Sequence, residues 1–335
     1  MILVTGATGC VGRAVVERLV NSGHAVKCLF HWGHEHPAPR RVVITGGDVR
    51  NQDSIYEALT DGGECDTIVH LAFIRRETKE DKFEEVNIRG TENVIDAAKR
   101  AKVQRLIMVG CLGAEVRSPF PHLRSLGIAE ERVRQSGLNF TVLKSAVIYG
   151  EGDWLTHWLN QIARNLPLVM PLPHGGYTKL QPIWVGDVAA CIARSLELRS
   201  TFRQVITIGG PQALTLADIA KITLKAKAEQ RRLVRVPTPL THYLVSFLSR
   251  FQDMLSEPEM DALSYNRTAE IGSVHRTFGF APVKMVPERL AYLSPGYQPP
   301  PPPVRFKPRS PAPVAALDPA SSQRMRARIR ALLGR

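Results

Sequence analysis

The chain has 335 residues, of which 44% are hydrophobic, and a formal net charge of +13. This length and composition are typical of a soluble globular protein with a sizeable core, built as one large domain with an appended lobe or as two domains. No apolar run approaches the roughly 18 residues of a membrane-spanning helix. No charged and apolar leader precedes the first strand, so we expect a cytoplasmic protein.

The excess of positive charge is concentrated near the C-terminus. Residues 295–335 hold eight Lys and Arg residues and one Asp, which supply +7 of the net +13. The rest of the chain is modestly basic, with one local run of cations between Lys225 and Arg235. Bulk charge therefore argues against a nucleic-acid partner.

The cysteines and histidines do not form a metal-binding pattern. The five cysteines are odd in number and include no C-x-x-C pair, which favours reduced thiols over a disulfide or zinc framework. The histidines His31, His34 and His36 have no carboxylate or cysteine partner at ligand spacing. We expect no metal site.

The first stretch of the chain predicts a strand, a glycine turn and a helix. An apolar run at 2–4 leads to Gly6, Gly9 and Gly12, and a helical apolar pattern then covers residues 11–20. Gly6 permits a tight turn, Gly9 allows close approach of a pyrophosphate, and Gly12 lets the helix pack on the strand. The positive helix end would then face the anion. The alternative is an ordinary strand, turn and helix without a ligand.

Strands and helices then alternate along the chain. The expected strands are 25–30, 42–44, 67–72, 105–109, 140–148 and 205–208, and the expected helices are 53–59 with Asp53 as its cap, 86–101, 127–136 and 215–225. This alternation predicts an α/β fold with a Rossmann-type, doubly wound parallel sheet. Its ligand crevice would lie at the carboxyl ends of the strands, where the glycine turn opens.

The regular alternation fades after residue 150. We expect the sheet domain to comprise residues 1–150 plus about 180–210, and a smaller substrate-type lobe to comprise about 151–179 and 211–294. Residues 295–320 read as a disordered Pro-rich linker. In the lobe, Trp154 and Trp158 lie one helical turn apart, which suits either a planar small-molecule substrate or packing of the lobe.

The last segment, residues 321–335, predicts a basic amphipathic helix. Four apolar residues recur at helical spacing: Met325, Ile329, Leu332 and Leu333. Four arginines lie between or beside them: Arg324, Arg326, Arg328 and Arg330. Such a helix on a proline tether suits an anionic membrane surface or an acidic protein partner, which would place the protein peripherally at a membrane. The alternative is a solvated tail without a partner.

Several stretches together resemble a known superfamily. They are Thr5-Gly6-x-x-Gly9-x-x-Gly12, Gly47-Asp48-Val49, His70-Leu71-Ala72, Val86-Asn87-Ile88-x-Gly90-Thr91-x-Asn93-Val94 and Thr141 to Gly150. Over roughly residues 1–210 the chain resembles the extended and atypical short-chain dehydrogenase/reductases. Within these it is similar to the NAD-dependent epimerase/dehydratase-like and NmrA-like proteins, including the NAD(P)-binding accessory subunit of respiratory complex I.

The resemblance implies a dinucleotide cofactor and the residues that would bind it. Those residues are Thr5, Gly6, Thr8, Gly9, Cys10, Val11, Gly12, His31, Asp48, Val49, Leu71 and Ala72. In this family Asp48 would lie near the adenine, and His70 with the two residues after it would line the nicotinamide side.

The family's catalytic residues are missing from this chain. The family transfers hydride with a Ser at the end of a strand and a Tyr-x-x-x-Lys pair on the next helix, where the Lys lowers the pKa of the Tyr. Here Cys111 or Gly110 takes the place of Ser, His122 that of Tyr and Leu126 that of Lys. No lysine occurs between 102 and 144 and no tyrosine between 56 and 149, so a shifted alignment does not restore the pair.

Three hypotheses about function follow. The crevice binds a dinucleotide without turning it over, and the protein is a redox sensor, assembly factor or accessory subunit; this is the one we favour. Alternatively, His122 or another acid/base, with Cys111 beside His122, serves an active reductase, epimerase or dehydratase on a carbonyl or sugar-nucleotide substrate. The third hypothesis is an interaction module with an empty crevice.

The end of the second strand bears on the choice of cofactor. Residues 24–34 contain no carboxylate that would bind the ribose 2′-OH of NAD. His31, with Arg40 or Arg41 nearby in the sequence, tolerates a 2′-phosphate. NADP is therefore slightly favoured over NAD.

Overall fold

The computed structural model describes residues 1–31, 36–38, 41–237, 239–240, 243, 263–294, 296–297 and 304–306. The basic helix predicted at 321–335 lies outside these residues, as does most of the linker predicted at 295–320.

Seven parallel strands form the central sheet, in the order β12-β7-β6-β5-β1-β2-β4. They are β1 (Ile2–Thr5), β2 (Val26–Phe30), β4 (Val43–Gly46), β5 (Thr67–His70), β6 (Arg105–Cys111), β7 (Phe140–Ser145) and β12 (Gln204–Ile208). β1, β2 and β5 are buried along their whole length, as central strands covered on both faces must be. The predicted doubly wound α/β fold is confirmed.

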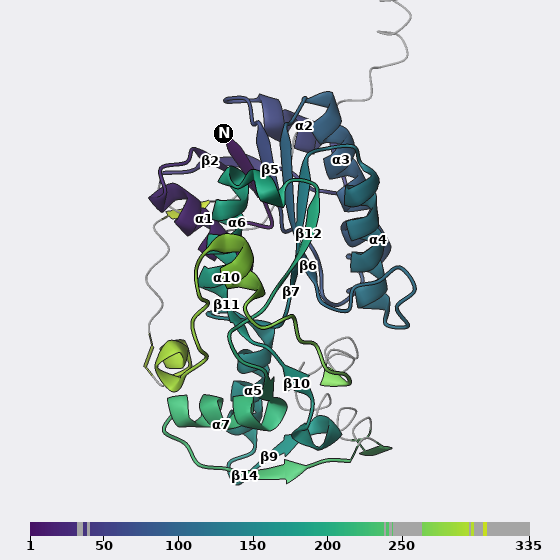
Figure 1. Ribbon diagram of the computed structural model, residues 1–335. Coiled ribbons are helices and arrows are strands. Elements are labelled where there is room, and N and C mark those ends of the chain that lie inside the picture. The colour runs from purple at the N-terminus through teal and green to yellow at the C-terminus, as the bar shows by residue number, and fades with distance from the viewer. Residues whose placement is uncertain are drawn as a thin grey trace, which may run out of the picture.

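Helices cover both faces of this sheet (Figure 1). One layer contains α1 (Cys10–Asn21), α6 (Val185–Glu197) and α10 (Ser273–Phe278), and the other contains α2 (Gln52–Thr60), α3 (Gly90–Arg100) and α4 (Pro121–Gln135). From β1 the chain proceeds to β2 and β4 on one side, and to β5, β6, β7 and β12 on the other. The strand order therefore reverses beside β1, which is where a doubly wound sheet binds its ligands.

A smaller lobe lies below the carboxyl ends of the strands in Figure 1. It contains α5 (Trp154–Asn165), α7 (Leu216–Ala226), β9 (Val169–Leu172), β14 (Arg232–Arg235) and η4 (Pro287–Leu293), around an apolar core of its own. The remaining short elements are β3 (His36–Ala38), η1 (Glu84–Arg89), β8 (Ile148–Tyr149), η2 (Pro173–Gly176), β10 (Lys179–Leu180), β11 (Ile183–Trp184), η3 (Arg199–Thr201), β13 (Leu214–Thr215) and β15 (Val304–Phe306).

Four predicted boundaries are wrong. Asn51, not Asp53, caps α2, because its side chain accepts a hydrogen bond from the Ser54 N–H at 3.1 Å. The helix predicted at 86–101 is a π-helical turn followed by α3. The helix predicted at 127–136 begins at Pro121, a residue favoured in the first turn. The strand predicted at 140–148 is divided into β7 and β8.

Candidate functional site

The glycine turn joins β1 to α1 at the carboxyl edge of the sheet. Gly6 has a φ of +68°, and a Cβ there would lie 2.5 Å from the carbonyl oxygen of Leu71. A Cβ on Gly12 would collide with the carbonyl oxygen of Gly6, so the turn requires glycine at both positions. Gly9 is the exposed N-cap of α1, and the first turn of this helix contains no acidic side chain. Its N–H groups can therefore bind an anion.

A cavity of about 440 Å³ opens at this turn. Its wall includes the start of α1, the loop after β5, the ends of β6 and β7, the start of α4, and residues at the start of α5. The predicted site residues on this wall are Gly6, Gly9, Cys10, Val11, Gly12, Leu71, Cys111 and His122. The predicted residues at the glycine turn thus share one cavity with Cys111 and His122, which the resemblance places at the family's catalytic positions.

Thr5 and His70 lie inside the fold, not on the cavity wall. Both side chains are fully buried, and Thr5 Oγ1 lies 2.8 Å from His70 Nδ1. His70 Nε2 lies 3.2 Å from Thr91 Oγ1, and burial lowers the pKa of His70 to about 3. The expectation that His70 lines the nicotinamide side is wrong, because its ring is enclosed by these two threonines. The pair instead fixes the end of β5 against the end of β1.

The other predicted cofactor residues lie at the turn and after β4. The backbone of Ala72 lies against Gly6, and Thr8 is half-buried in the turn itself. Val49 is buried, and its carbonyl oxygen accepts a hydrogen bond from Asn93 Nδ2 at 2.9 Å. This last contact joins two of the stretches that carry the family resemblance.

His31, at the end of β2, lies beside an ion pair. Its Nε2 is 3.1 Å from Asp48 Oδ2, and Arg50 donates to the same oxygen from Nη2 at 2.6 Å and from Nε at 2.9 Å. Arg50 Nη2 is also 3.2 Å from His31 Nε2. Although burial opposes ionisation of Asp48, its hydrogen bonds to Arg50 lower the pKa of the carboxyl overall. The sequence had not indicated Arg50, which lies two residues beyond the predicted adenine contact.

The residues that the resemblance places at the family's catalytic positions line the cavity. His122 and Leu126 lie one turn apart on α4, and both line the wall together with Cys111 at the end of β6. Burial, and to a smaller extent Arg75 and Arg267, lower the pKa of His122 to about 4. The imidazole is therefore neutral near pH 7, and within the described residues its buried Nδ1 has no hydrogen-bond partner.

Cys111 contacts an arginine of the C-terminal part of the chain. Arg267 donates from Nη1 to Cys111 Sγ at 3.3 Å. Burial raises the pKa of Cys111 overall, although Arg267 opposes this shift. The thiol is thus protonated near neutral pH and does not supply a ready base.

An ion pair between a buried Glu and a half-buried Lys lies behind the end of β6. Glu130 of α4 and Lys144 of β7 are joined by Oε2 and Nζ at 3.0 Å, and Lys144 also donates to the carbonyl oxygen of Ala114 at 2.7 Å. A Cβ on Gly110 would collide with Glu130, so glycine at the end of β6 makes room for this carboxyl group. Burial raises the pKa of Glu130 to about 7 despite the attraction of Lys144. Sequence spacing gave no indication of the pair, because fourteen positions separate its members.

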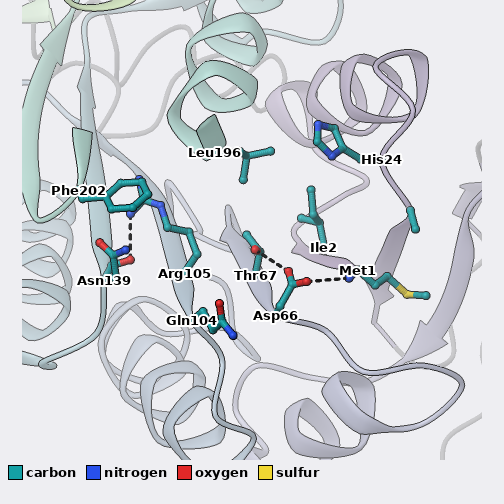
Figure 2. Close-up of a pocket in the computed structure, with 11 residues that line it drawn as sticks. Met1, Ile2, His24, Asp66, Thr67, Gln104, Arg105, Asn139, Leu196 and Phe202 are labelled. Carbon is teal, nitrogen blue, oxygen red and sulfur yellow. Dashed lines mark hydrogen bonds and ion pairs between the residues drawn. The ribbon is translucent and has the colours of Figure 1, made fainter. Parts of the chain in front are cut away.

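A second cavity, of about 340 Å³, lies at the opposite, amino ends of the strands (Figure 2). Arg105 on its wall donates to the carbonyl oxygens of Asn139 and Ser195 and lies 4.3 Å from the ring centroid of Phe202. The guanidinium thus joins β6 to the segments around β7 and β12. None of the predicted site residues lines this cavity, so the cavity at the glycine turn is the candidate site.

The described residues contain neither a cluster of metal-ligating side chains nor a membrane-spanning helix. No three His, Cys, Asp or Glu side chains in the described part of the chain are grouped to hold a metal ion. Among the described helices, none is long and apolar enough to cross a membrane.

Comparison with known proteins shows what this chain is similar to. The model of the NAD dependent epimerase/dehydratase family matches residues 2–209, which include all seven strands of the central sheet. The chain is 31% identical over 248 residues to the mitochondrial NADH dehydrogenase (ubiquinone) 1 alpha subcomplex subunit 9 of Arabidopsis thaliana. This match covers 71% of the chain and 60% of the relative, so the chain spans less than two thirds of that protein's length.

Two further matches are more distant. The chain is 26% identical over 256 residues to the photosystem II assembly factor Ycf39 of Cyanophora paradoxa, which covers 70% of the chain and 71% of the relative. A solved structure of UDP-glucose 4-epimerase from Thermus thermophilus in complex with NAD superposes with a TM-score of 0.60 and 18% identity, over 78% of this chain and 97% of that one. At this identity the likeness to the epimerase shows the fold alone.

Proposed function

This chain belongs to the NAD dependent epimerase/dehydratase family, and from that premise we propose that it holds a dinucleotide in place without turning it over, as a redox-sensing, assembly or accessory protein. Residues 1–150 with about 180–210 bind the dinucleotide in this proposal, and about 151–179 with 211–294 form the substrate-type lobe. The pyrophosphate binds at the N–H groups of the glycine turn, and the nicotinamide extends towards Cys111.

The replaced pair on α4 is the observation that carries this proposal. A neutral His122 and an apolar Leu126 line the cavity at the positions that the resemblance assigns to the family's Tyr and Lys. Tyrosine and lysine are both absent from the described lining of the cavity, and Leu126 brings no charge to hold a ribose. The names of the two relatives, a respiratory complex subunit and an assembly factor, agree with a non-catalytic role.

A turnover assay tests the proposal. The full chain is incubated with NADH or NADPH and a panel of carbonyl and sugar-nucleotide compounds, and the cofactor and products are followed. We expect nucleotide binding without turnover. Sustained turnover that His122→Ala abolishes would overturn the proposal and establish the second candidate, an active reductase, epimerase or dehydratase. The buried, unpartnered Nδ1 of His122 on the cavity wall is the observation in favour of this candidate.

The proposed cofactor is NAD(P), with NADP slightly favoured. Residues 24–34, which include β2, contain no carboxylate. The Arg50 guanidinium lies beside His31 at the end of this strand. The carboxylate of Asp48 opposes a 2′-phosphate, which keeps the preference small.

Titration of NADPH and NADH into the full chain and into His31→Glu tests the preference for NADP. We expect the wild type to bind NADPH more tightly than NADH, and His31→Glu to show the reverse preference. The same ratio of NADPH affinity to NADH affinity in both proteins would contradict the preference for NADP.

A further inference from the structure

The C-terminal part of the chain returns from the lobe to the sheet domain. β15 (Val304–Phe306) pairs antiparallel with β3 (His36–Ala38), which lies in the connection from β2 to β4. The two strands form a sheet of their own, separate from the central one. A segment near the end of the described chain is thus joined to the loop that follows β2.

Pro37 fixes which N–H groups hold these two strands together. The opposite residues are Val304 and Ala38, Arg305 and Pro37, and Phe306 and His36. Proline has no N–H, so the middle pair cannot exchange two hydrogen bonds. Hydrogen-bonded and non-hydrogen-bonded pairs alternate in an antiparallel ladder, so the two outer pairs are the hydrogen-bonded ones. The N–H groups of Val304 and Phe306 therefore donate to β3, whereas that of Arg305 points away from it.

The same C-terminal segment is attached at a second point. The Tyr297 hydroxyl donates to Glu151 Oε2 at 2.9 Å, and the carbonyl oxygen of Glu151 accepts from Arg13 Nη2 at 3.2 Å. Arg13 lies in the first turn of α1, and Gly152, the residue after Glu151, lines the candidate cavity. Tyr297 is therefore held near the helix start at which the proposed function places the pyrophosphate.

The two attachments lie on opposite sides of the glycine turn. β3 follows β2, which neighbours β1 on one side, whereas Glu151 follows β7 and β8, and β7 lies on the other side of β1 in the sheet. At the end of β2, His31 Nε2 lies 3.1 Å from Asp48 Oδ2, and the proposed function places the adenosine near these two residues. One attachment is thus beyond the adenosine end of the proposed dinucleotide site, and the other is beside its pyrophosphate.

The sequence between the two attachments favours their simultaneous formation. Residues 298–303 join them and contain five consecutive prolines, Pro299–Pro303. Because each proline has a fixed φ, such a segment has few conformations to lose when both of its ends are attached.

We propose that the segment from Tyr297 to β15 is a strap, attached on both sides of the dinucleotide site, that slows release of the bound nucleotide. The inference rests on the proposed function, which places the dinucleotide at the glycine turn with its adenosine towards His31. Coupling between two binding events is reciprocal, so the bound nucleotide strengthens attachment of the strap by the same factor. The nucleotide content of the protein then controls how firmly the residues beyond Phe306 are tethered to the sheet domain.

Release of NADPH from the full chain tests the strap. The release rate is measured by stopped-flow fluorescence for the wild type, Val304→Pro, Phe306→Pro and Tyr297→Phe. Arg305→Pro is the matched control, because it introduces the same residue at the one position of β15 whose N–H the pairing does not use. Hydrogen exchange of the amide groups of 304–306, with and without saturating NADPH, measures the reciprocal effect on the wild type.

We expect release to be about threefold or more faster in Val304→Pro, Phe306→Pro and Tyr297→Phe, since each loses a hydrogen bond of the strap, and unchanged in Arg305→Pro. Saturating NADPH should slow exchange at 304 and 306. Wild-type release rates in all three variants, equally fast release from Arg305→Pro and Phe306→Pro, or exchange that NADPH does not alter would overturn the strap alone. Failure of the wild type to bind NADPH or NADH at millimolar concentration would overturn the proposed function and the strap with it.

Discussion

At the scale of single residues, the three glycines of the turn differ in what they do. Gly12 and Gly6 are required by close backbone contacts, whereas a Cβ on Gly9 would lie 3.4 Å from the Gly6 carbonyl oxygen, and Gly9 has an ordinary φ of −69°. Gly9 is therefore dispensable for folding and is needed only if an anion approaches the N–H groups.

This difference gives a direct test of the turn. We expect Gly9→Ala to change the free energy of unfolding by less than about 1 kcal/mol and to weaken NAD(P) binding about tenfold or more, because its methyl group lies where the pyrophosphate must approach. Gly12→Ala should lose both stability and binding. Chemical denaturation and calorimetry measure the two effects, and wild-type affinity in Gly9→Ala would contradict the assignment.

The neutral His122 predicts a pH dependence of stability. Its folded pKa of about 4 lies below its ordinary value of 6.5, so the unfolded chain binds the proton more readily between these values. Stability is then lost as pH falls through this window. Between about pH 7 and about pH 5 the wild type should lose about 1–2 kcal/mol more than His122→Gln.

Urea unfolding at both pH values measures this difference. His275→Gln, which removes an exposed histidine of α10, is the control and should follow the wild type. If the wild type and His122→Gln lose stability equally on acidification, His122 is not held neutral by burial.

Sequence spacing located those candidate site residues that lie close together along the chain. Gly6, Gly9 and Gly12 were found because strand, turn and helix are consecutive in the chain, and they line the predicted cavity. Arg267 could not be found in this way, because 156 positions separate it from the cysteine it contacts. His70 was misplaced because its motif gives its position along the strand but not the neighbours that enclose it.

At the scale of elements, the Glu130–Lys144 pair joins α4 to β7 directly behind the candidate site. The folded pKa of Glu130, about 7, lies above its ordinary value of 4.5, so the folded state binds the proton more tightly. The stability from this group is complete below about pH 4.5 and is lost as pH rises through about 7.

Glu130→Gln should therefore gain stability relative to the wild type as pH rises. The predicted relative gain between about pH 5 and about pH 8 is about 2–3 kcal/mol, from the size of the pKa difference. Denaturation curves at both pH values measure it, and Glu131→Gln, on the same helix and paired with Arg134 at 2.9 Å, is the matched control. If the difference in free energy of unfolding between the wild type and Glu130→Gln is the same at both pH values, the carboxyl group of Glu130 does not titrate between them.

The sequence located elements better than their ends. Apolar runs located every strand of the central sheet, both the fully buried β1, β2 and β5 and the more exposed edge strands β4 and β12. The start of α4 was missed because its first turn, Pro121–Arg124, is polar or exposed except for Leu123 and gives no apolar period. The π-helical turn before α3 was missed as well, and its Asn87 side chain forms hydrogen bonds with the backbone of Ile74, outside the helix.

At the scale of the whole molecule, we propose that the Pro-rich and basic C-terminal segment directs the protein to an anionic membrane surface or an acidic partner. Most of this segment, including all of 321–335, lies outside the described residues, so its composition alone carries the proposal. The full chain should co-sediment with anionic liposomes, and a chain ending at Pro295 should not. Replacement of Arg324, Arg326, Arg328 and Arg330 by Gln should abolish binding as the truncation does. Equal sedimentation of all three proteins would remove the membrane hypothesis.

The central claim is that the glycine turn holds a dinucleotide in a fold that has lost the family's catalytic pair. The most direct measurement is the mass of the nucleotide released when freshly purified full chain is denatured, with Gly9→Ala treated in parallel. We predict NAD(H) or NADP(H) from the wild type, near one molecule per chain, and much less from the variant. No nucleotide from either protein, together with no binding of added NAD(P) at millimolar concentration, would contradict the claim and leave an interaction module with an empty crevice.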